Sequence, residues 1–273
     1  MVIKPLSHDD FPTFYSWARK EGWTISFQEQ RLFQNQWQPC FFTLWERGCC
    51  CGFISVVIYK TSGWIGNLLI HPEKRRKGYG STLFDFALEQ LEKNQLGRIW
   101  LTASAQGAGI YRQRGFVQVE QIIRWTGVGS GQRNKPSPSG SAATVEQLVQ
   151  LDLDCWKESR RPLLRLLADD GIIFKEGGSM VLLQPGPEFW QAGPWLTPLS
   201  APQETRRLLT AIIETTPVAV PLIMDIVESS SLDLLLRQHG FRIAGQNELM
   251  CKSQEPLDDL TAVTALASLG SIG

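Results

Sequence analysis

The stretch from Trp64 to Gly80, WIGNLLIHPEKRRKGYG, followed by STLFDFALEQLEK (81–93), carries most of the information about the fold. The first part is apolar, as expected of a buried strand, and the last part has the apolar spacing of an amphipathic helix. Between them lies the basic, glycine-containing run Arg75–Gly80. Helix N-termini carry free backbone N–H groups and a partial positive charge. A strand–turn–helix unit of this kind is therefore suited to hold an anion such as pyrophosphate.

The residue types of this run fit the same reading. Gly78 and Gly80 allow the backbone to approach a ligand closely. Arg75, Arg76 and Lys77 add positive charge, and arginine can bind phosphate with two parallel hydrogen bonds. The run lacks the third glycine and later acid of a dinucleotide fingerprint, and the Gly-Lys-Ser/Thr of a P-loop. By itself, it could equally be a basic surface turn.

A second motif follows an apolar, strand-like stretch at 98–103. Residues 104–116 read SAQGAGIYRQRGF. Together with Arg-x-x-Gly-x-Gly, this segment resembles the GNAT N-acetyltransferase superfamily, whose members carry Asn-x-x-Ala-x-x-x-Tyr-x-x-x-Gly-Phe here. Tyr111, Gly115 and Phe116 match that pattern, whereas Ser104 and Gly107 replace its asparagine and alanine. The replacement puts in doubt the usual side-chain hydrogen bond near the pantetheine.

The resemblance implies an α/β fold with a mixed sheet and acetyl-CoA (coenzyme A) as the acyl donor. It implies that Tyr111 is a general acid that protonates the departing thiolate; the alternative is a core tyrosine that only orients the sulfur. Backbone N–H groups at the end of the 63–70 strand would meet the developing oxyanion. The residues expected to bind the cofactor are Leu68, Leu69, Ile70, Arg75, Arg76, Lys77, Gly78, Tyr79, Gly80, Ser81, Ser104 and Tyr111.

The acceptor side is less well defined by the sequence. Four carboxylates are candidates for a general base, namely Glu21, Glu29, Glu73 and Glu120. We expect Glu21, because the region after the first helix lines acceptor sites in the family; an amine that binds already neutral would need no base. Trp23, Trp195 and Trp156 are candidate substrate-binding aromatics, although core packing is the more common role for each one taken singly.

The second half of the chain repeats the pattern of the first. LRQHGF (236–241) aligns with YRQRGF (111–116), and each follows a helix-like stretch and an apolar strand. Leu236 replaces Tyr111, and no Arg-x-x-Gly-x-Gly precedes the expected helix at 203–215. We therefore expect tandem GNAT-like (acyl-CoA N-acyltransferase) domains of the two-domain bacterial YitH-like type, the second degenerate. The second would either wall the acceptor site or replace a homodimer partner.

This pattern predicts a domain organisation. Residues 1–126 form a GNAT domain with the acetyl-CoA site, 127–143 a Gly/Ser/Pro-rich linker, and 144–252 the degenerate domain. Residues 253–273 form a tail, either a short apolar helix docked on one domain or a frayed end. The protein would then be a monomer built as a pseudo-dimer, or a homodimer.

Composition excludes several classes. The 27 basic and 27 acidic residues give zero net charge, so no nucleic-acid footprint is expected. No apolar run is long enough to cross a membrane, and the N-terminus has no signal-peptide pattern, so a cytoplasmic protein without membrane contact is expected. The six cysteines have no metal-ligand spacing, so free thiols and no metal are expected.

Two functions fit these observations. The first is an acetyl-CoA-dependent N-acetyltransferase that acts on a primary amine of a small molecule or peptide. The second is a non-catalytic acyl-CoA-binding sensor or partner-binding protein. Tyr111 favours the enzyme, and the serine at position 104 mildly favours the alternative.

Overall fold

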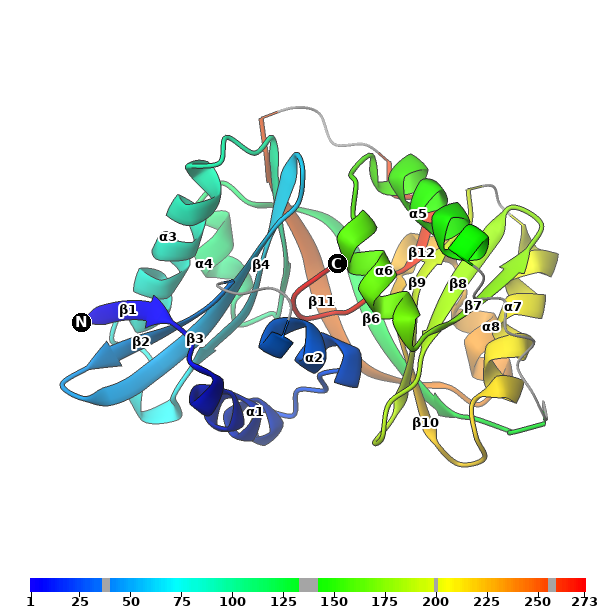
Figure 1. The fold of residues 1–273 in the computed structure, drawn as a ribbon, viewed down its shortest axis with the longest axis horizontal. Helices are drawn as coiled ribbons and strands as arrows, with labels where there is room; N and C mark the ends of the chain where they lie inside the picture. The colour runs from blue at the N-terminus through cyan, green and yellow to red at the C-terminus, as the bar shows by residue number, and fades with distance from the viewer. Residues whose placement is uncertain (36–39, 133–141, 199–200, 255–258) are drawn as a thin grey trace.

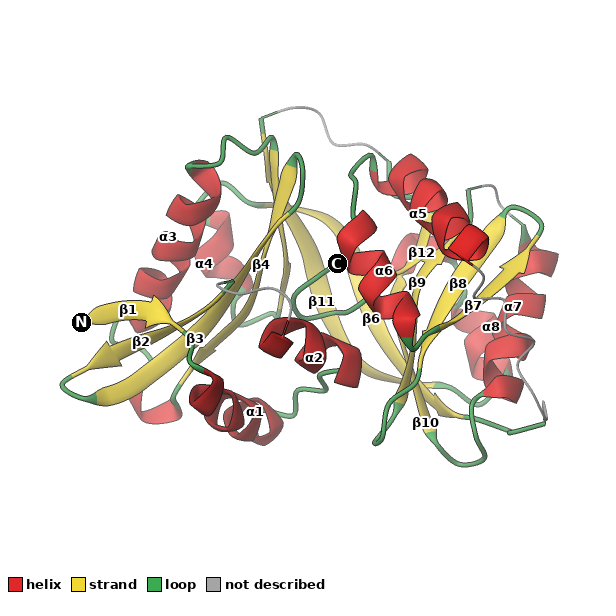
Figure 2. Cartoon of the chain, in the orientation of Figure 1, coloured by secondary structure: helices red, strands yellow, loops and turns green. Residues whose placement is uncertain are grey.

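A single twisted sheet runs through the whole protein in the computed structural model, which describes residues 1–35, 40–132, 142–198, 201–254 and 259–273. The strand order is β1-β2-β3-β4-β5-β11-β6-β10-β12-β9-β8-β7, and most neighbours are antiparallel (Figures 1 and 2). The strands are β1 (Val2–Pro5), β2 (Phe41–Glu46), β3 (Cys49–Ile58), β4 (Ser62–Ile70), β5 (Arg98–Ala103), β6 (Val117–Val128), β7 (Ile172–Glu176), β8 (Ser179–Gln184), β9 (Trp190–Leu196), β10 (Pro221–Val227), β11 (Arg242–Ser253) and β12 (Val263–Ala265). The expected mixed α/β fold is confirmed.

Helices cover both faces of this sheet. They are α1 (Phe11–Lys20), α2 (Phe27–Asn35), α3 (Tyr79–Glu92), α4 (Ala108–Arg112), α5 (Ala142–Trp156), α6 (Arg161–Asp169), α7 (Pro202–Thr215) and α8 (Asp233–Gln238), with short 3₁₀ turns at His8–Asp10, Pro72–Lys74 and Glu228–Ser230. α3 and α4 share one core with the first half of the sheet, and α7 and α8 share another with the second half. α1, α2, α5 and α6 build a third core that both halves share.

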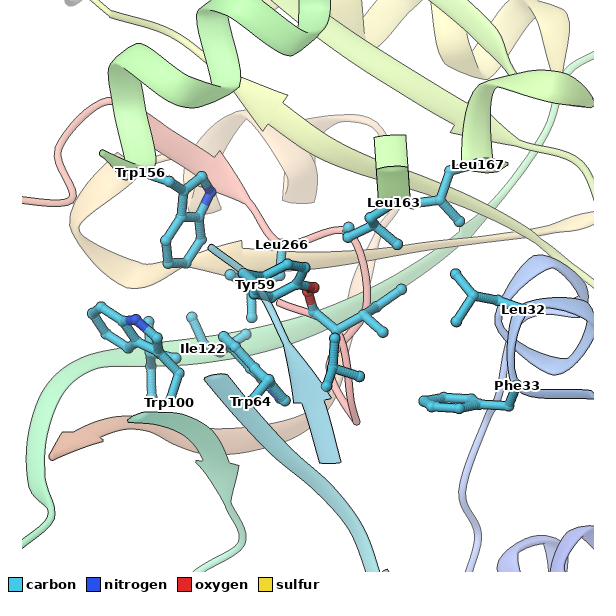
Figure 3. Packing of buried hydrophobic residues seen from close by; sticks show 14 of the residues in the cluster. Leu32, Phe33, Tyr59, Trp64, Trp100, Ile122, Trp156, Leu163, Leu167 and Leu266 are labelled. Atoms are coloured by element: carbon cyan, nitrogen blue, oxygen red, sulfur yellow. The ribbon is translucent and has the colours of Figure 1, made fainter. Parts of the chain in front are cut away.

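The third core holds the two halves together. Trp100 of β5 packs edge-to-face on Trp156 of α5, with ring centroids 5.7 Å apart. Figure 3 shows this pair beside Tyr59 and Leu266, with Leu163 and Leu167 of α6 above them. Aromatic pairs of this kind add to the free energy of burial. The halves therefore meet through a buried apolar core.

The last strand of each half belongs to the sheet of the other half. β11 pairs with β5 from Glu248↔Ala103 to Ser253↔Arg98, and β6 pairs with β10 from Val128↔Pro221 to Ile122↔Val227. β6 and β11 also pair with each other at the centre of the sheet. The two sequence repeats thus exchange their final strands, and each half is completed by the other. The predicted domain boundaries at residues 126 and 144 therefore stay a prediction from the sequence.

The tail differs from both expectations. It contains β12, which pairs with β9 and β10, and residues 266, 267, 271 and 272 have no exposed surface. The chain then ends at the centre of the molecule, between the halves (Figure 1). Neither a helix nor a frayed end forms, because the small and apolar side chains of this segment fill space at the shared core. Most of the predicted linker, residues 133–141, lies outside the described residues.

Candidate active site

An opening between β4 and β5 defines the site. The two parallel strands are paired only at Ser62↔Arg98, Gly63↔Ile99 and Trp64↔Trp100. β4 then follows an irregular register against β3, and Asn67 adopts a left-handed backbone with φ of 54°. Such a bulge turns a strand out of its ladder and frees backbone groups. Beyond Trp64, that edge of β4 faces a cavity.

The cavity has a volume of about 280 Å³ and takes residues from both halves. From the first half come the loop before α2, the diverging parts of β4 and β5, and the start of the α4 region. From the second half come part of β11 and the tail. The lining residues are Gly22, Trp23, Thr24, Ile25, Glu29, Ile65, Gly66, Asn67, Leu68, Leu101, Thr102, Ser104, Tyr111, Arg124, Ala244, Gly245, Asn247, Leu269 and Gly270.

Tyr111 lies in the wall of this cavity. Its ring packs on Phe84 of α3, with centroids 4.8 Å apart, and it is nine-tenths buried. Burial raises the pKa of Tyr111 to about 12, because the phenolate would lose its hydration. The hydroxyl is therefore protonated at neutral pH and can donate a proton. Ser104 lines the same cavity, and its Oγ accepts the N–H of Gly107 at 3.3 Å.

The replacement at position 107 is explained by the Tyr111 ring. A Cβ on Gly107 would lie 3.2 Å from Tyr111 Cε2 and 3.4 Å from its hydroxyl oxygen. The distance to Cε2 is tighter than ordinary contact, so an alanine would press on the Tyr111 ring. The glycine leaves the tyrosine hydroxyl room at the edge of the cavity.

The basic loop leads into α3 as the sequence predicts. Gly78 has a left-handed backbone with φ of 85° and caps the helix, so α3 begins at Tyr79. A Cβ on Gly78 would meet nothing within 4 Å, and one on Gly80 would meet only Ile70, at 3.7 Å. The first N–H groups of α3 therefore face open space that a phosphate could fill. Arg76 and Lys77 are exposed beside it.

Several predicted cofactor residues have other partners. Arg75 Nε donates to the Ile70 carbonyl at 3.1 Å, and the Tyr79 hydroxyl donates to the Glu46 carboxylate. The side chain of Leu69 is buried in the core, whereas Leu68 lines the cavity. Ser81 is half-buried in the first turn of α3. The side chain of Tyr79 is thus occupied, so this residue offers a ligand only its backbone.

The position of Glu21 does not support the role of base. Glu21 does not line the cavity, and its Oε1 lies 2.6 Å from Arg75 Nη2 on the partly exposed side of the loop. The sequence indicated the correct region, because Gly22 and Trp23 do line the cavity. An ion pair between helix α1 and the basic loop, which no local pattern reveals, takes up the carboxylate instead.

Among the four candidate carboxylates, Glu29 is the one that lines the cavity. Glu73 lies exposed in the turn before the basic loop, and Glu120 is half-buried on β6 away from the cavity. Glu29 lies on the face of α2 that is turned toward the tail, and it is 2% exposed.

The three tryptophans are placed differently. Trp23 is 37% exposed and lines the cavity, as a substrate-binding aromatic would. Trp195 has no exposed surface and lies in the core of the second half, so the substrate contact predicted for it is not supported. Trp156 is buried against Trp100. Position in the sequence repeat could not separate these cases, because burial depends on the other half.

Some cavity residues carry no signal in the sequence. Arg124 of β6 holds Asp225 of β10 through two hydrogen bonds of 2.7 and 2.9 Å. Asn67 donates to Ser55 Oγ at 3.1 Å. Asn247 reaches the cavity from the exchanged strand β11. These residues come together only through strand exchange and the β4 bulge, so sequence spacing could not identify them.

The corresponding opening in the second half is filled. β9 and β10 pair in parallel only from Leu222↔Trp190 to Met224↔Ala192. Beyond that point β12 lies between them, with Ala265 paired to both Ile226 and Trp195. The tail thus occupies in the second half the place that stays open between β4 and β5.

The strand opening, the helix start beside the basic loop and the buried tyrosine at the cavity are features that suit acyl transfer from a CoA thioester. Residues 4–116 match the family model described as Acetyltransferase (GNAT) family. The first part of the chain thus has the sequence pattern of the GNAT acetyltransferases, and the second half has a GNAT-like fold.

Relatives match the chain over different lengths. Holothin acyltransferase from Pseudoalteromonas sp. (strain SANK 73390) is 22% identical over 97% of this chain and 92% of its own. The [ribosomal protein bS18]-alanine N-acetyltransferase of Escherichia coli (strain K12) is 24% identical over 42% of this chain and 80% of its own.

Solved structures match the two-part fold. A structure from Pyrococcus horikoshii superposes with a TM-score of 0.82 at 14% identity, covering 99% of this chain and 95% of the other. A GCN5-related N-acetyltransferase from Sphaerobacter thermophilus gives a TM-score of 0.63 at 13% identity, covering 96% and 98%.

The described residues contain neither a metal-binding cluster nor a membrane-spanning helix. No group of three His, Cys, Asp or Glu side chains there could hold a metal ion. No described helix is long and apolar enough to cross a membrane. All six cysteines are free thiols.

Proposed function

We propose that this protein transfers an acetyl group from acetyl-CoA to the primary amine of a small-molecule or peptide acceptor, with Tyr111 as general acid. The observation that carries the proposal is the position of Tyr111, whose buried, protonated hydroxyl lies in the wall of the cavity at the β4–β5 opening. The family model supports acyl transfer, and the basic loop supports a CoA donor.

The residues around the opening suit a CoA thioester. The start of α3 and the side chains of Arg76 and Lys77 would hold the pyrophosphate. The unpaired edge of β4 at residues 65–70 would bind the pantetheine through backbone hydrogen bonds. Acetyl-CoA, when bound, supplies the acetyl group as an activated thioester.

The chain's own groups would position the reactants and move protons. The cavity holds the acceptor nitrogen near the thioester carbon, and positioning alone can supply much of the rate gain. As the N–C bond forms and the C–S bond breaks, the nitrogen loses a proton to solvent and the sulfur gains one from Tyr111. The Tyr111 hydroxyl donates to the sulfur and then regains a proton from solvent. Backbone N–H groups at Leu68 and Leu69 would stabilise the charge on the carbonyl oxygen.

Release of free CoA thiol tests this function. The purified protein is supplied with acetyl-CoA and a panel of primary amines, and amine-dependent thiol release is expected. Calorimetry with CoA gives the affinity separately from turnover. Thiol release that no amine accelerates, together with tight CoA binding, would point to the non-catalytic alternative.

A further inference from the structure

Glu29 is a buried carboxylate without a cation beside it. Its Oε2 accepts the Ser268 hydroxyl at 2.6 Å, and its Oε1 accepts the Ser271 hydroxyl. Both serines belong to the tail. Among the residues that the structure describes, no lysine, arginine or histidine lies within ion-pair distance of this carboxylate.

The other buried acids are satisfied differently. Asp152 pairs with Arg160 through hydrogen bonds of 3.0 and 2.5 Å. Asp225 pairs with Arg124. Glu158 accepts the backbone N–H groups of Thr61 and Ser159. Burying an ionised carboxylate without a partner is expensive, so such groups are paired or bind a ligand. Glu29 accepts two hydroxyl hydrogen bonds and has no cationic side chain beside it. Because it borders a cavity, a positively charged ligand could pair with it there.

The groups around Glu29 compensate its negative charge only in part. Burial raises the pKa of Glu29, and the two serines and the charge of Arg124 on β6 only partly oppose that rise. Asp225 on β10 and the hydroxyl of Tyr15 on α1 also face it electrostatically. Arg124 is already held by Asp225, so its charge is largely balanced. A cation that enters the cavity would gain most from Glu29.

The tail lines the cavity beside this carboxylate. Leu269 and Gly270 line the cavity, and the Leu269 carbonyl accepts the Thr102 hydroxyl of β5. A Cβ on Gly66 would lie 2.5 Å from the Gly270 carbonyl oxygen and 2.6 Å from Ser271 Cα. Glycine at position 66 of β4 is therefore what allows the tail to approach so closely.

We propose that Glu29 determines acceptor specificity by binding the ammonium group of a small primary amine, which releases one proton to solvent before its nitrogen attacks the thioester, and that Ser268 and Ser271 position the Glu29 carboxylate. The inference rests on the proposed function and names its acceptor class. The amine would carry a compact apolar or aromatic body, because Trp23, Ile25 and Leu101 line other parts of the cavity, whose volume of about 280 Å³ suits a small molecule.

Steady-state kinetics test the acceptor class. Wild-type protein, Glu29→Gln and the matched control Glu120→Gln are assayed with acetyl-CoA and benzylamine, tryptamine or a trialanine peptide. Glu29→Gln is expected to raise the amine KM at least tenfold and to leave the KM for acetyl-CoA unchanged. Glu120→Gln is expected to match the wild type. Equal amine KM values in all three proteins would overturn the inference while leaving the proposed function intact.

Two further outcomes also decide the matter. A wild-type protein that binds acetyl-CoA but acetylates only the peptide, or none of the small amines, would contradict the proposed acceptor class. Loss of acetyl-CoA binding itself would instead be a failure of the proposed function. The two failures are therefore distinguishable.

Gly270→Ala provides a second variant that leaves the carboxylate in place. Its Cβ would lie 3.7 Å from Asn67 Oδ1 and 3.8 Å from Glu29 Oε1, which is ordinary contact. The methyl group would narrow the part of the cavity beside Glu29. We expect a rise of about threefold to tenfold in the amine KM, larger for tryptamine than for benzylamine. No rise for either amine would contradict a binding site beside Glu29.

Thermal unfolding separates a binding role from a structural one. The pKa of Glu29 is higher in the folded protein than in the unfolded chain. Between these two pKa values the folded protein binds more protons than the unfolded chain, so the wild type loses stability as pH rises through this range. Glu29→Gln lacks this loss, so its midpoint should exceed that of the wild type at pH 8 and the gap should shrink at pH 5. A Glu29→Gln protein that is less stable at both pH values would show a purely structural carboxylate.

The positioning role of Ser268 and Ser271 is tested by a pH profile, which a loss of packing alone would not shift. Ser268→Ala and Ser271→Ala remove the two hydroxyl donors that lower the pKa of Glu29. Their loss should shift the pH profile of kcat/KM for the amine toward higher pH. Unchanged profiles in both variants would overturn the positioning role.

Discussion

The two halves of this protein share a strand–helix frame but differ at one place, the opening between their parallel strands. In the first half, β4 and β5 separate beyond Trp64, and a cavity occupies the gap. In the second half, β12 enters between β9 and β10 and completes the sheet. The same tail then continues to the open site of the first half. One segment thus fills one opening and lines the cavity at the other.

The second half contributes to the structure of the first although it lacks the site motifs. The second half lacks the tyrosine and the glycine loop, and its opening is filled by backbone hydrogen bonds, so it has no room for a pantetheine. It supplies β11 to the first half, and with the tail it walls the cavity. A half without the tyrosine and the glycine loop therefore still contributes walls to the cavity of the other half.

The largest effect is expected for Tyr111→Phe, which removes the proton donor from the open half. Turnover should fall about 100-fold, within the range typical of general acid catalysis. Affinity for acetyl-CoA should stay within about twofold, because the ring still packs on Phe84. Steady-state assays and calorimetry check both values. Undiminished turnover would reduce Tyr111 to a packing residue.

The next effect is expected for Gly66→Ala, which breaks the contact between the open half and the tail. The added Cβ would overlap backbone atoms of Gly270 and Ser271, so the tail must move. Overpacking of this kind costs about 1–3 kcal/mol of stability. Urea denaturation should show that loss, with a raised amine KM in the folded protein. Wild-type stability would mean that the tail is not held against β4.

A smaller effect is expected for Arg76→Ala in the basic loop, a feature that the second half lacks. An exposed contact between arginine and phosphate contributes about 1 kcal/mol, so affinity for CoA should fall about fivefold. The loss should shrink at high salt, since screening weakens exposed charge pairs. Calorimetry at two ionic strengths tests this. Affinity that does not change would contradict the assignment of the loop to the pyrophosphate.

The smallest effect on activity is expected for Trp195→Phe in the filled half. Trp195 has no exposed surface and packs beside β12, so stability should fall by about 1–2 kcal/mol. The amine KM should not change, because this side chain does not line the cavity. A large rise in the amine KM would restore the substrate contact that the sequence suggested.

Local chemistry explains what could be predicted from the sequence. Arg75–Gly80 and Tyr111 stand out because each lies in a short motif whose spacing carries its meaning. Glu29 was one of four candidate carboxylates, and only the approach of Ser268 and Ser271, more than 200 residues away, distinguishes it. The exchanged strands have no periodic signature either. The position of Glu29 and the strand exchange both depend on contacts between residues far apart in the sequence, so local patterns could not predict them.

The most direct test of the account is a calorimetric titration of the intact chain with acetyl-CoA. The comparison of the halves predicts one site per chain, with an affinity that falls when Arg76 is replaced. Two sites per chain would show that β12 does not close the second opening. The absence of any binding would contradict the assignment of the β4–β5 opening to the acyl donor.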